Sequence, residues 1–124
     1  MDKPLKGIRV LDLARVLSGP HCAMLLGDMG AEVIKVEKPG EGDMTRSNLP
    51  KFHGESTYFM AHNRNKKSIT LNFRKPEAKR IFLKLVEKSD VIIENFRAGT
   101  MEAMGLSYEV LRAANPKIIL TRIS

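Results

Sequence analysis

The chain has 124 residues, of which 43% are hydrophobic and 28% are charged, and its formal net charge is +7. This length and composition suit one globular domain with a core of its own. Nine glycines and six prolines exclude collagen-like and low-complexity chains, and a single cysteine excludes an intrachain disulfide and a zinc cluster.

No run of apolar residues is long enough to cross a membrane as a helix. The N-terminal segment MDKPLKGIRVLDLA carries charges inside its apolar part, so it lacks the continuous apolar core of a secretory signal. We therefore predict an intracellular, cytoplasmic protein without a membrane partner.

The positive charge is concentrated in one segment. Residues 64–88 contain nine basic residues against Glu77 and Glu87, and the rest of the chain is balanced. This asymmetry indicates an anionic partner for one part of the surface. Many of these cations are also explained as the solvated face of one helix, and for the helical lysines we favour that interpretation. They are Lys75, Lys79, Arg80, Lys84 and Lys88.

The first half of the chain predicts a β-α-β unit. Residues 8–13, IRVLDL, are typical of a strand, and a helix follows, with Ser18 as its cap, Pro20 in its first turn and Gly30 as its stop. Residues 32–37, EVIKVE, predict a second strand. Residues 38–52 are rich in Pro, Gly, Asp and Ser, which indicates a loop.

The second half continues the alternation. Strands are predicted at 68–73, 90–95 and 117–124, and helices at 76–89 and 107–115, with a loop and one helical turn between 96 and 105. The fold class is therefore α/β, with a Rossmann-like, mostly parallel sheet and flanking helices. Because a parallel sheet normally continues from a strand into another helix, we expect residues 1–124 to be an incomplete N-terminal portion of the domain.

Cationic and amide side chains recur where the predicted strands end. In parallel α/β sheets ligands bind at these ends, and several cations at one edge would suit a ligand with more than one phosphate. The residues in question are Arg15 and Ser18, then Lys38, then Arg64, Lys66, Lys67, Asn72 and Arg74, then Asn95 and Arg97.

Other nucleotide motifs are missing. No GxGxxG follows the first strand and no GxxxxGK[ST] phosphate loop occurs, so neither a dinucleotide fingerprint nor a P-loop is supported. Nucleic-acid binding is compatible with the charge, but no recognition motif accompanies it.

Candidates for catalysis are scarce. His21 beside Cys22 has a simpler explanation in helix packing, and His53 and His62 are predicted to lie in loops or beside strands. Asp12 and Asp43 are interpreted as structural, as a strand-end partner and a turn former. No carboxylate pair or metal-ligand cluster is evident, so the residues indicate binding rather than catalysis.

Three ordered blocks of the sequence resemble a known family over the whole chain. They are PLKGIRVLDLARVLSGPHCAMLLGDMGAEVIKVEKPGEGDMTR, NRNKKSITLNFRKPEAK and SDVIIENFRAGTMEAMGLSYEVLRAANPKII. They resemble the opening of the family III coenzyme A transferases, also called the CaiB/BaiF type. This group includes formyl-CoA transferase, carnitine CoA-transferase and succinyl-CoA–glutarate CoA-transferase, and α-methylacyl-CoA racemase is a relative.

The resemblance implies an activity and a set of CoA contacts. Family members move CoA between an acyl-CoA and a carboxylic acid through intermediates on an aspartate, as interlocked homodimers and without a metal. The implied CoA contacts fall on Arg15, Leu17, Ser18, Lys38, Leu71, Asn72, Phe73, Arg74, Asn95, Phe96 and Arg97. These nearly coincide with the strand-end residues above, so the resemblance favours CoA over nucleic acid as the anionic partner.

The chain also departs from that pattern. Formyl-CoA transferase carries histidine in place of Arg15, arginine in place of Lys38, and arginine in place of Ala103. The family's nucleophilic aspartate falls after Ser124, so no residue here inherits that role, and we expect this chain alone to be inactive. Two alternatives remain at this point: an α-methylacyl-CoA racemase-like enzyme and a non-catalytic basic binding module.

Overall fold

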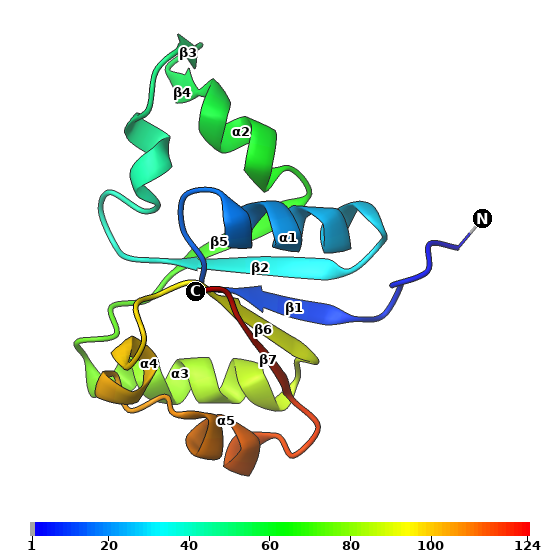
Figure 1. Ribbon diagram of the computed structural model, residues 1–124, viewed down its shortest axis with the longest axis vertical. Helices are drawn as coiled ribbons and strands as arrows, with labels where there is room; N and C mark the ends of the chain where they lie inside the picture. Colours follow the sequence, from blue (N-terminus) through cyan, green and yellow to red (C-terminus); the bar gives the residue numbers. More distant parts are fainter. Residues whose placement is uncertain (1) are drawn as a thin grey trace.

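The computed structural model describes residues 2–124, and its centre is a five-stranded sheet. The strand order is β5-β2-β1-β6-β7, and every neighbouring pair is parallel (Figure 1). The bounds are β1 Arg9–Asp12, β2 Glu32–Glu37, β5 Lys66–Thr70, β6 Val91–Glu94 and β7 Ile119–Arg122. This confirms the predicted parallel α/β architecture.

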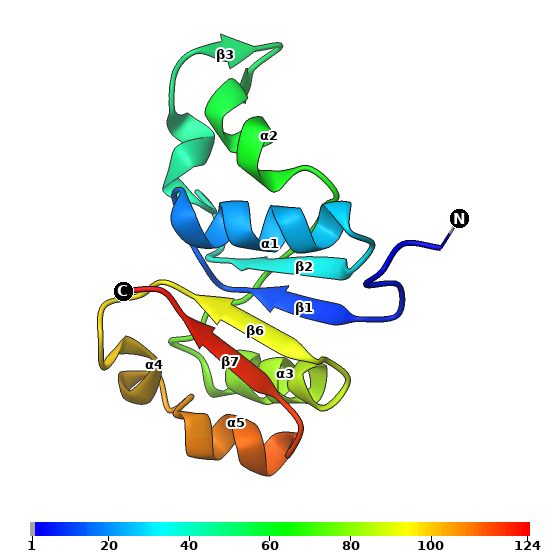
Figure 2. The same ribbon diagram turned by 45° about the vertical axis from the view of Figure 1, so that its right-hand side comes forward.

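Helices lie on both faces of the sheet. On one face α1 (Ser18–Asp28) packs against β1 and β2, and on the other α3 (Pro76–Glu87), α4 (Thr100–Ala103) and α5 (Tyr108–Ala114) form the second layer (Figures 1 and 2). A small lobe lies beyond α1. It consists of the 3-10 helix η1 (Met44–Ser47), the hairpin of β3 (Lys51–Phe52) and β4 (Glu55–Ser56), and α2 (Thr57–Asn63).

The alternation of side chains along each strand divides the core in two. Leu11, Ile92 and Phe82 belong to the buried cluster shared with α3, α4 and α5. Val10 and Val33 belong to the cluster under α1. Successive residues of a strand point to opposite faces, so β1 supplies both clusters from consecutive positions. The sheet is thus buried on both faces, as parallel sheets require.

Several sequence predictions are wrong in detail. β5 begins at Lys66 and ends at Thr70, so it starts and stops earlier than the predicted 68–73. Segment 38–52 is not all loop, because it contains η1 and β3. No helix was predicted at α2, and His62 lies within that helix rather than in a loop. Each of these elements is short, and its main contacts are with other segments of the chain.

The start of α1 also differs from the prediction. Ser18 is the first helical residue and not the cap. Leu17 occupies the cap position, and its side chain makes no capping hydrogen bond in the described part of the chain. Pro20 lies in the first turn as predicted, where the missing amide hydrogen costs little.

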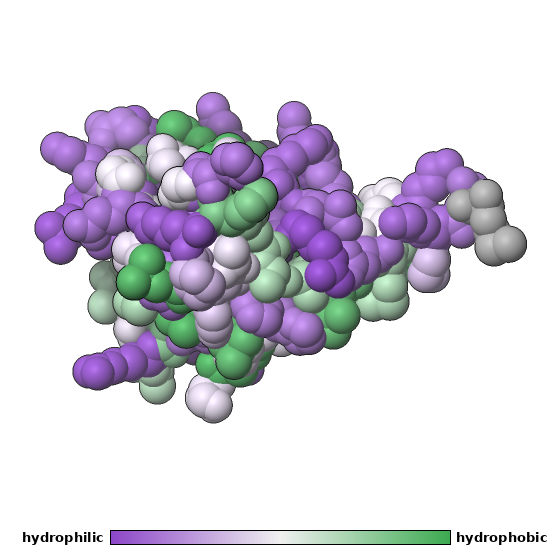
Figure 3. All heavy atoms as spheres, turned by 90° about the horizontal axis from the view of Figure 1, so that it is seen from above, coloured by the Kyte–Doolittle hydropathy of each residue, from purple (hydrophilic) through white to green (hydrophobic). Residues whose placement is uncertain are grey.

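The lobe exposes some apolar side chains. Met44, Leu49, Phe52 and Met60 are all exposed. Seen from above, hydrophobic residues are scattered among hydrophilic ones on this side of the molecule (Figure 3). Within residues 2–124, no helix has both the length and the apolar character needed to cross a membrane.

Gly19 provides a test of how closely α1 approaches the end of β1. A Cβ atom at Gly19 would lie 2.1 Å from the Cβ of Ala14, which the buried site cannot accommodate without movement. We expect Gly19→Ala to lower the free energy of unfolding by about 2 kcal/mol or more, as measured by urea denaturation.

Gly27→Ala is the matched control in the same helix. Its added Cβ would meet Val33 Cγ2 at 3.4 Å and the Cβ and carbonyl oxygen of Asn65 at 3.6 Å, all ordinary contacts. Because alanine favours helix by about 1 kcal/mol over glycine, this variant should be neutral or more stable. Equal destabilisation by both substitutions would contradict the close packing at Gly19.

Candidate functional site

A cavity of about 300 Å³ opens where β1, β2 and β5 end. Because these strands are parallel, the segments that follow them meet at the same edge of the sheet. The predicted residues that line the cavity are Arg15, Lys38, Leu71, Asn72, Phe73, Arg74 and Phe96. Lining residues that sequence reasoning missed are Leu13, Ala14, Lys35, Val36, Glu37, Gly42, Asp43 and Met104.

A second hollow of similar volume adjoins the cavity. It is lined by Arg15, Val16, Met44, Asn95, Phe96, Arg97 and Thr100, so the two hollows share Arg15 and Phe96. It lies between the ends of β1 and β6. From β1 the chain adds β2 and then β5 on one side, and then crosses to add β6 and β7 on the other side of β1, so the gap between β1 and β6 is the switch point of the sheet. Ligands of open α/β sheets bind at such a switch point. The predicted residues Leu17 and Ser18 line neither hollow.

Four exposed cations surround these hollows: Arg15, Lys38, Arg74 and Arg97. Lys38 contacts Glu41 at 2.7 Å, but both side chains are largely exposed, so this pair contributes little energy. Among residues 2–124, Arg74 and Arg97 have no ion-pair partner. The guanidinium of Arg15 lies 4.7 Å from the centre of the Phe96 ring. The rim of the site therefore offers positive charge to an anion.

The wall of the cavity is partly apolar. Leu71, Phe73, Phe96 and Met104 all pack against the cluster on the α3 side of the sheet. Phe73 meets the buried Phe82 edge to face at 5.3 Å between ring centres, which fixes its position. An apolar wall beneath a cationic rim suits a ligand that combines a planar or aliphatic part with phosphates.

The turn that carries Arg15 is held at its backbone. Asn95 accepts a hydrogen bond from the Arg15 amide at 2.8 Å and donates one to the Arg15 carbonyl at 2.7 Å. The next residue, Val16, has a φ of 70°, which is uncommon for a β-branched residue. Asn95 therefore contributes to the site by fixing the turn.

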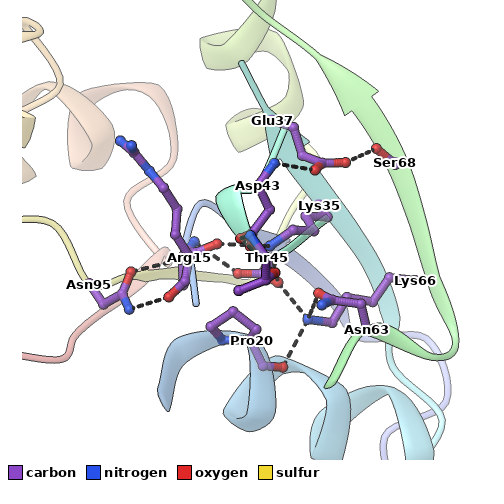
Figure 4. A network of polar contacts seen from close by, with 12 residues as sticks. Arg15, Pro20, Lys35, Glu37, Asp43, Thr45, Asn63, Lys66, Ser68 and Asn95 are labelled. Carbon is purple, nitrogen blue, oxygen red and sulfur yellow. Dashed lines mark hydrogen bonds and ion pairs between the residues drawn. The ribbon is translucent and has the colours of Figure 1, made fainter. Parts of the chain in front are cut away.

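A buried ionic cluster of Asp12, Lys35, Asp43 and Lys66 lies beneath this turn (Figure 4). Lys66 donates to Asp12 Oδ2, the Pro20 carbonyl and Asn63 Oδ1, each at 2.8 Å. Burial lowers the pKa of the Lys66 ammonium, and the Asp12 carboxylate opposes that effect. The expectation that Lys66 faces a ligand is wrong, because its ammonium group is buried and pairs with Asp12.

Arg64 and Lys67 are also engaged away from the cavity. Arg64 pairs with Asp28 at 2.7 Å, and Lys67 pairs with Glu32 at 2.6 Å. Both partners lie near the amino ends of the parallel strands, at the opposite edge from the cavity. The helical cations of α3, by contrast, agree with a solvated face, since all except the half-buried Lys79 are exposed.

Glu37 fixes the other side of the cavity. Its carboxylate accepts hydrogen bonds from the Arg46 guanidinium, from the Asp43 amide at 2.8 Å, and from Ser68 Oγ. Burial alone would raise the pKa of Glu37, but these hydrogen bonds outweigh it and lower the pKa to about 2. Gly42 must be small here, because a Cβ would lie 2.7 Å from Glu37 Oε1.

The residues considered as catalytic candidates make packing, capping and ion-pair contacts within the protein. Cys22 belongs to α1 and packs against the apolar cluster on that face of the sheet, as predicted. Asp43 caps η1 by accepting from the Thr45 amide, and Asp12 pairs with Lys66. Among residues 2–124, no three His, Cys, Asp or Glu side chains lie close enough to hold a metal ion.

The sequence pattern that defines CoA-transferase family III matches residues 5–124. The chain belongs to this family. Succinyl-CoA:glutarate CoA-transferase of Mus musculus is 53% identical over 98% of the chain, which spans 28% of that relative. Formyl-CoA:oxalate CoA-transferase of Bradyrhizobium is 46% identical over 99% of the chain, which spans 29% of that relative.

Solved structures agree with the family. A CaiB/BaiF family protein from Brucella suis superimposes on the whole chain with a TM-score of 0.93 and 45% identity. The chain covers 34% of that protein. The family III chain described here thus spans about a third or less of the lengths of these relatives.

The depressed pKa of Glu37 predicts a pH dependence of stability. Its folded pKa lies below its ordinary value of 4.5, so the stabilisation is complete above that value and is lost as the pH falls towards 2. We expect Glu37 to contribute about 2 to 3 kcal/mol at neutral pH. Between pH 5 and pH 2 the free energy of unfolding of the unmodified chain should therefore fall by this additional amount. Glu37→Gln lacks the titrating carboxyl, so its fall over the same range should be about 2 to 3 kcal/mol smaller.

Glu41→Gln is a control, because Glu41 is exposed and, within residues 2–124, forms an ion pair with Lys38 alone. Its pH profile should follow that of the unmodified chain. A Glu37→Gln profile that also follows the unmodified chain would contradict the assignment.

Proposed function

We propose that this chain carries the CoA-binding part of a family III CoA-transferase. The observation that carries the proposal is the convergence of Arg15, Lys38, Arg74 and Arg97 from four strand ends onto one apolar-walled site. CoA carries a diphosphate between its ribose and its pantetheine arm, a third phosphate on the 3′ position of that ribose, and an adenine ring at the ribose end. Guanidinium and ammonium groups are the side chains that bind phosphates.

The shape of the site supports an extended ligand. The two hollows are about 300 Å³ each, and they share Arg15 and Phe96. A ligand longer than either hollow would cross from one to the other past these two residues. In this assignment the apolar wall of Leu71, Phe73 and Met104 contacts the adenine or the pantetheine arm.

The proposed reaction of the whole enzyme is transfer of CoA from an acyl-CoA to a carboxylic acid. This chain binds and orients the CoA moiety, and residues outside the 124 supply the nucleophilic carboxylate. The succinyl-CoA relatives support a carboxylate acceptor, and the names of the matched relatives favour a transferase over a racemase. A cytoplasmic location and an interlocked homodimer of the whole enzyme complete the proposal.

Arg74 tests the proposal directly. It is exposed at the cavity and free of an ion-pair partner within residues 2–124, so Arg74→Ala removes a cation without unpairing a protein group. In calorimetric titrations with CoA we expect Arg74→Ala to weaken binding about tenfold or more, as for a charged hydrogen bond.

Lys84→Ala is the matched control, because Lys84 is exposed on α3 and lines neither hollow. Its CoA affinity should stay within about twofold of the unmodified chain, since a distant surface charge is screened by salt. Unchanged affinity in Arg74→Ala, or an equal loss in both variants, would argue against the assigned site.

A further inference from the structure

The buried ionic cluster of Asp12, Lys35, Asp43 and Lys66 is an unusual feature of the sheet. Its four side chains are at most 2% exposed, and two of them come from neighbouring positions of the central strands β1 and β2. Two cations and two anions balance in formal charge. On this face the sheet is apolar beneath α1 and becomes charged near the strand ends, beside the cavity.

Lys35 joins the two segments that carry cations of the site. Its ammonium donates to the Ala14 carbonyl at 2.8 Å, one residue before Arg15. The same ammonium lies 3.0 Å from Asp43 Oδ2, at the end of the loop that begins with Lys38. The Asp43 amide is in turn held by Glu37 at 2.8 Å, so the loop is closed on both sides by buried groups.

The turn after β1 has an unfavourable backbone conformation at Val16, and several hydrogen bonds hold it in place. Ala14 donates to Asp12 Oδ1 at 2.9 Å and accepts from Lys35, while Arg15 makes two hydrogen bonds with Asn95. Val16 follows in the left-handed region, where a β-branched residue is strained. A strained turn persists when contacts with the surrounding structure hold it in place. The hydrogen bond from Lys35 to the Ala14 carbonyl is one of these contacts.

Stability is a poor explanation for this cluster. Removing two charges from water costs about as much as their attraction returns, and apolar replacements of buried ion pairs are often neutral or stabilising. Asp43 Oδ2 lacks a well-formed hydrogen bond even though it is buried and close to Lys35. Buried ion pairs are better explained by a role in fixing the geometry of neighbouring segments.

We propose that Lys35 and Asp43 are positioning residues of the CoA site, which set the separation of Arg15 and Lys38 by joining their two segments. Neither residue needs to touch CoA in this role. This inference rests on the proposed function for its ligand, but the positioning itself is a property of the ligand-free chain.

The test uses the double variant Lys35→Met/Asp43→Asn, which removes the ion pair and preserves side-chain volume. Hydrogen–deuterium exchange of the ligand-free chain is measured first. We expect the amides of Arg15 and Asp43 to exchange at least tenfold faster, while amides of the strand centres, such as Leu11 and Ile34, keep their rates. Calorimetry should then show CoA affinity reduced about tenfold or more.

The double variant Glu32→Gln/Lys67→Met is the matched control. It removes the ion pair between Glu32 of β2 and Lys67 of β5, and the contact of Glu32 with Arg9, at the amino ends of the strands and far from the cavity. Arg15 and Asp43 should exchange as in the unmodified chain. If Lys35→Met/Asp43→Asn does not fold, Asp43→Asn alone decides: it frees only the loop, so Asp43 should exchange faster and Arg15 should not.

Two results would overturn the positioning role. One is unchanged exchange at Arg15 and Asp43, and the other is faster exchange throughout the sheet, which would mark a purely structural pair. If the unmodified chain does not bind CoA, the proposed function fails. In that case local loosening in the variant still supports positioning, and its absence still refutes it.

Discussion

The parallel alignment of all five strands is the constraint on which the site depends. It brings the segments after β1, β2, β5 and β6 to one edge, although the ends of β1 at Asp12 and of β6 at Glu94 are 82 positions apart in the chain. No two of the cations Arg15, Lys38, Arg74 and Arg97 are neighbours in sequence. Their convergence is a consequence of strand direction, and a single antiparallel strand would remove its cation from the group.

The face of the sheet under α1 has to satisfy two different demands. Beneath the helix it must be apolar to pack closely, and Val10, Val33 and Ala23 serve that purpose. Near the strand ends it must hold two loops in a defined arrangement, and buried charges with matched partners do this better than apolar contacts, which are not directional. The change from one kind of residue to the other occurs within two positions of β1, from Val10 to Asp12. The binding edge and the core are thus built on the same strands.

The sequence predicted the fold class and the order of the main elements, because β-branched runs and helical periodicity are local signals. It predicted slightly less than half of the cavity lining, through strand-end positions and the family resemblance. It did not predict where the cations of segment 64–67 go. A lysine at a strand end has the same sequence signature whether it faces solvent, a ligand or a buried aspartate, and only the position of Asp12 across the sheet decides for Lys66. Lys35 gave a usable signal, because a charge between the apolar residues Ile34 and Val36 of an inner strand requires a buried partner. Helix α2 could not be foreseen, since its seven residues are held largely by α1 and η1.

The central claim is that CoA binds across the two hollows at the carboxyl edge of the sheet. The most direct measurement is nuclear magnetic resonance of the isotopically labelled chain during titration with CoA. The account predicts chemical-shift changes concentrated at Arg15, Lys38, Phe73, Arg74 and Phe96, with little change along the exposed face of α3. Changes confined to the lysines of α3, or absent from the cavity at saturating CoA, would contradict it.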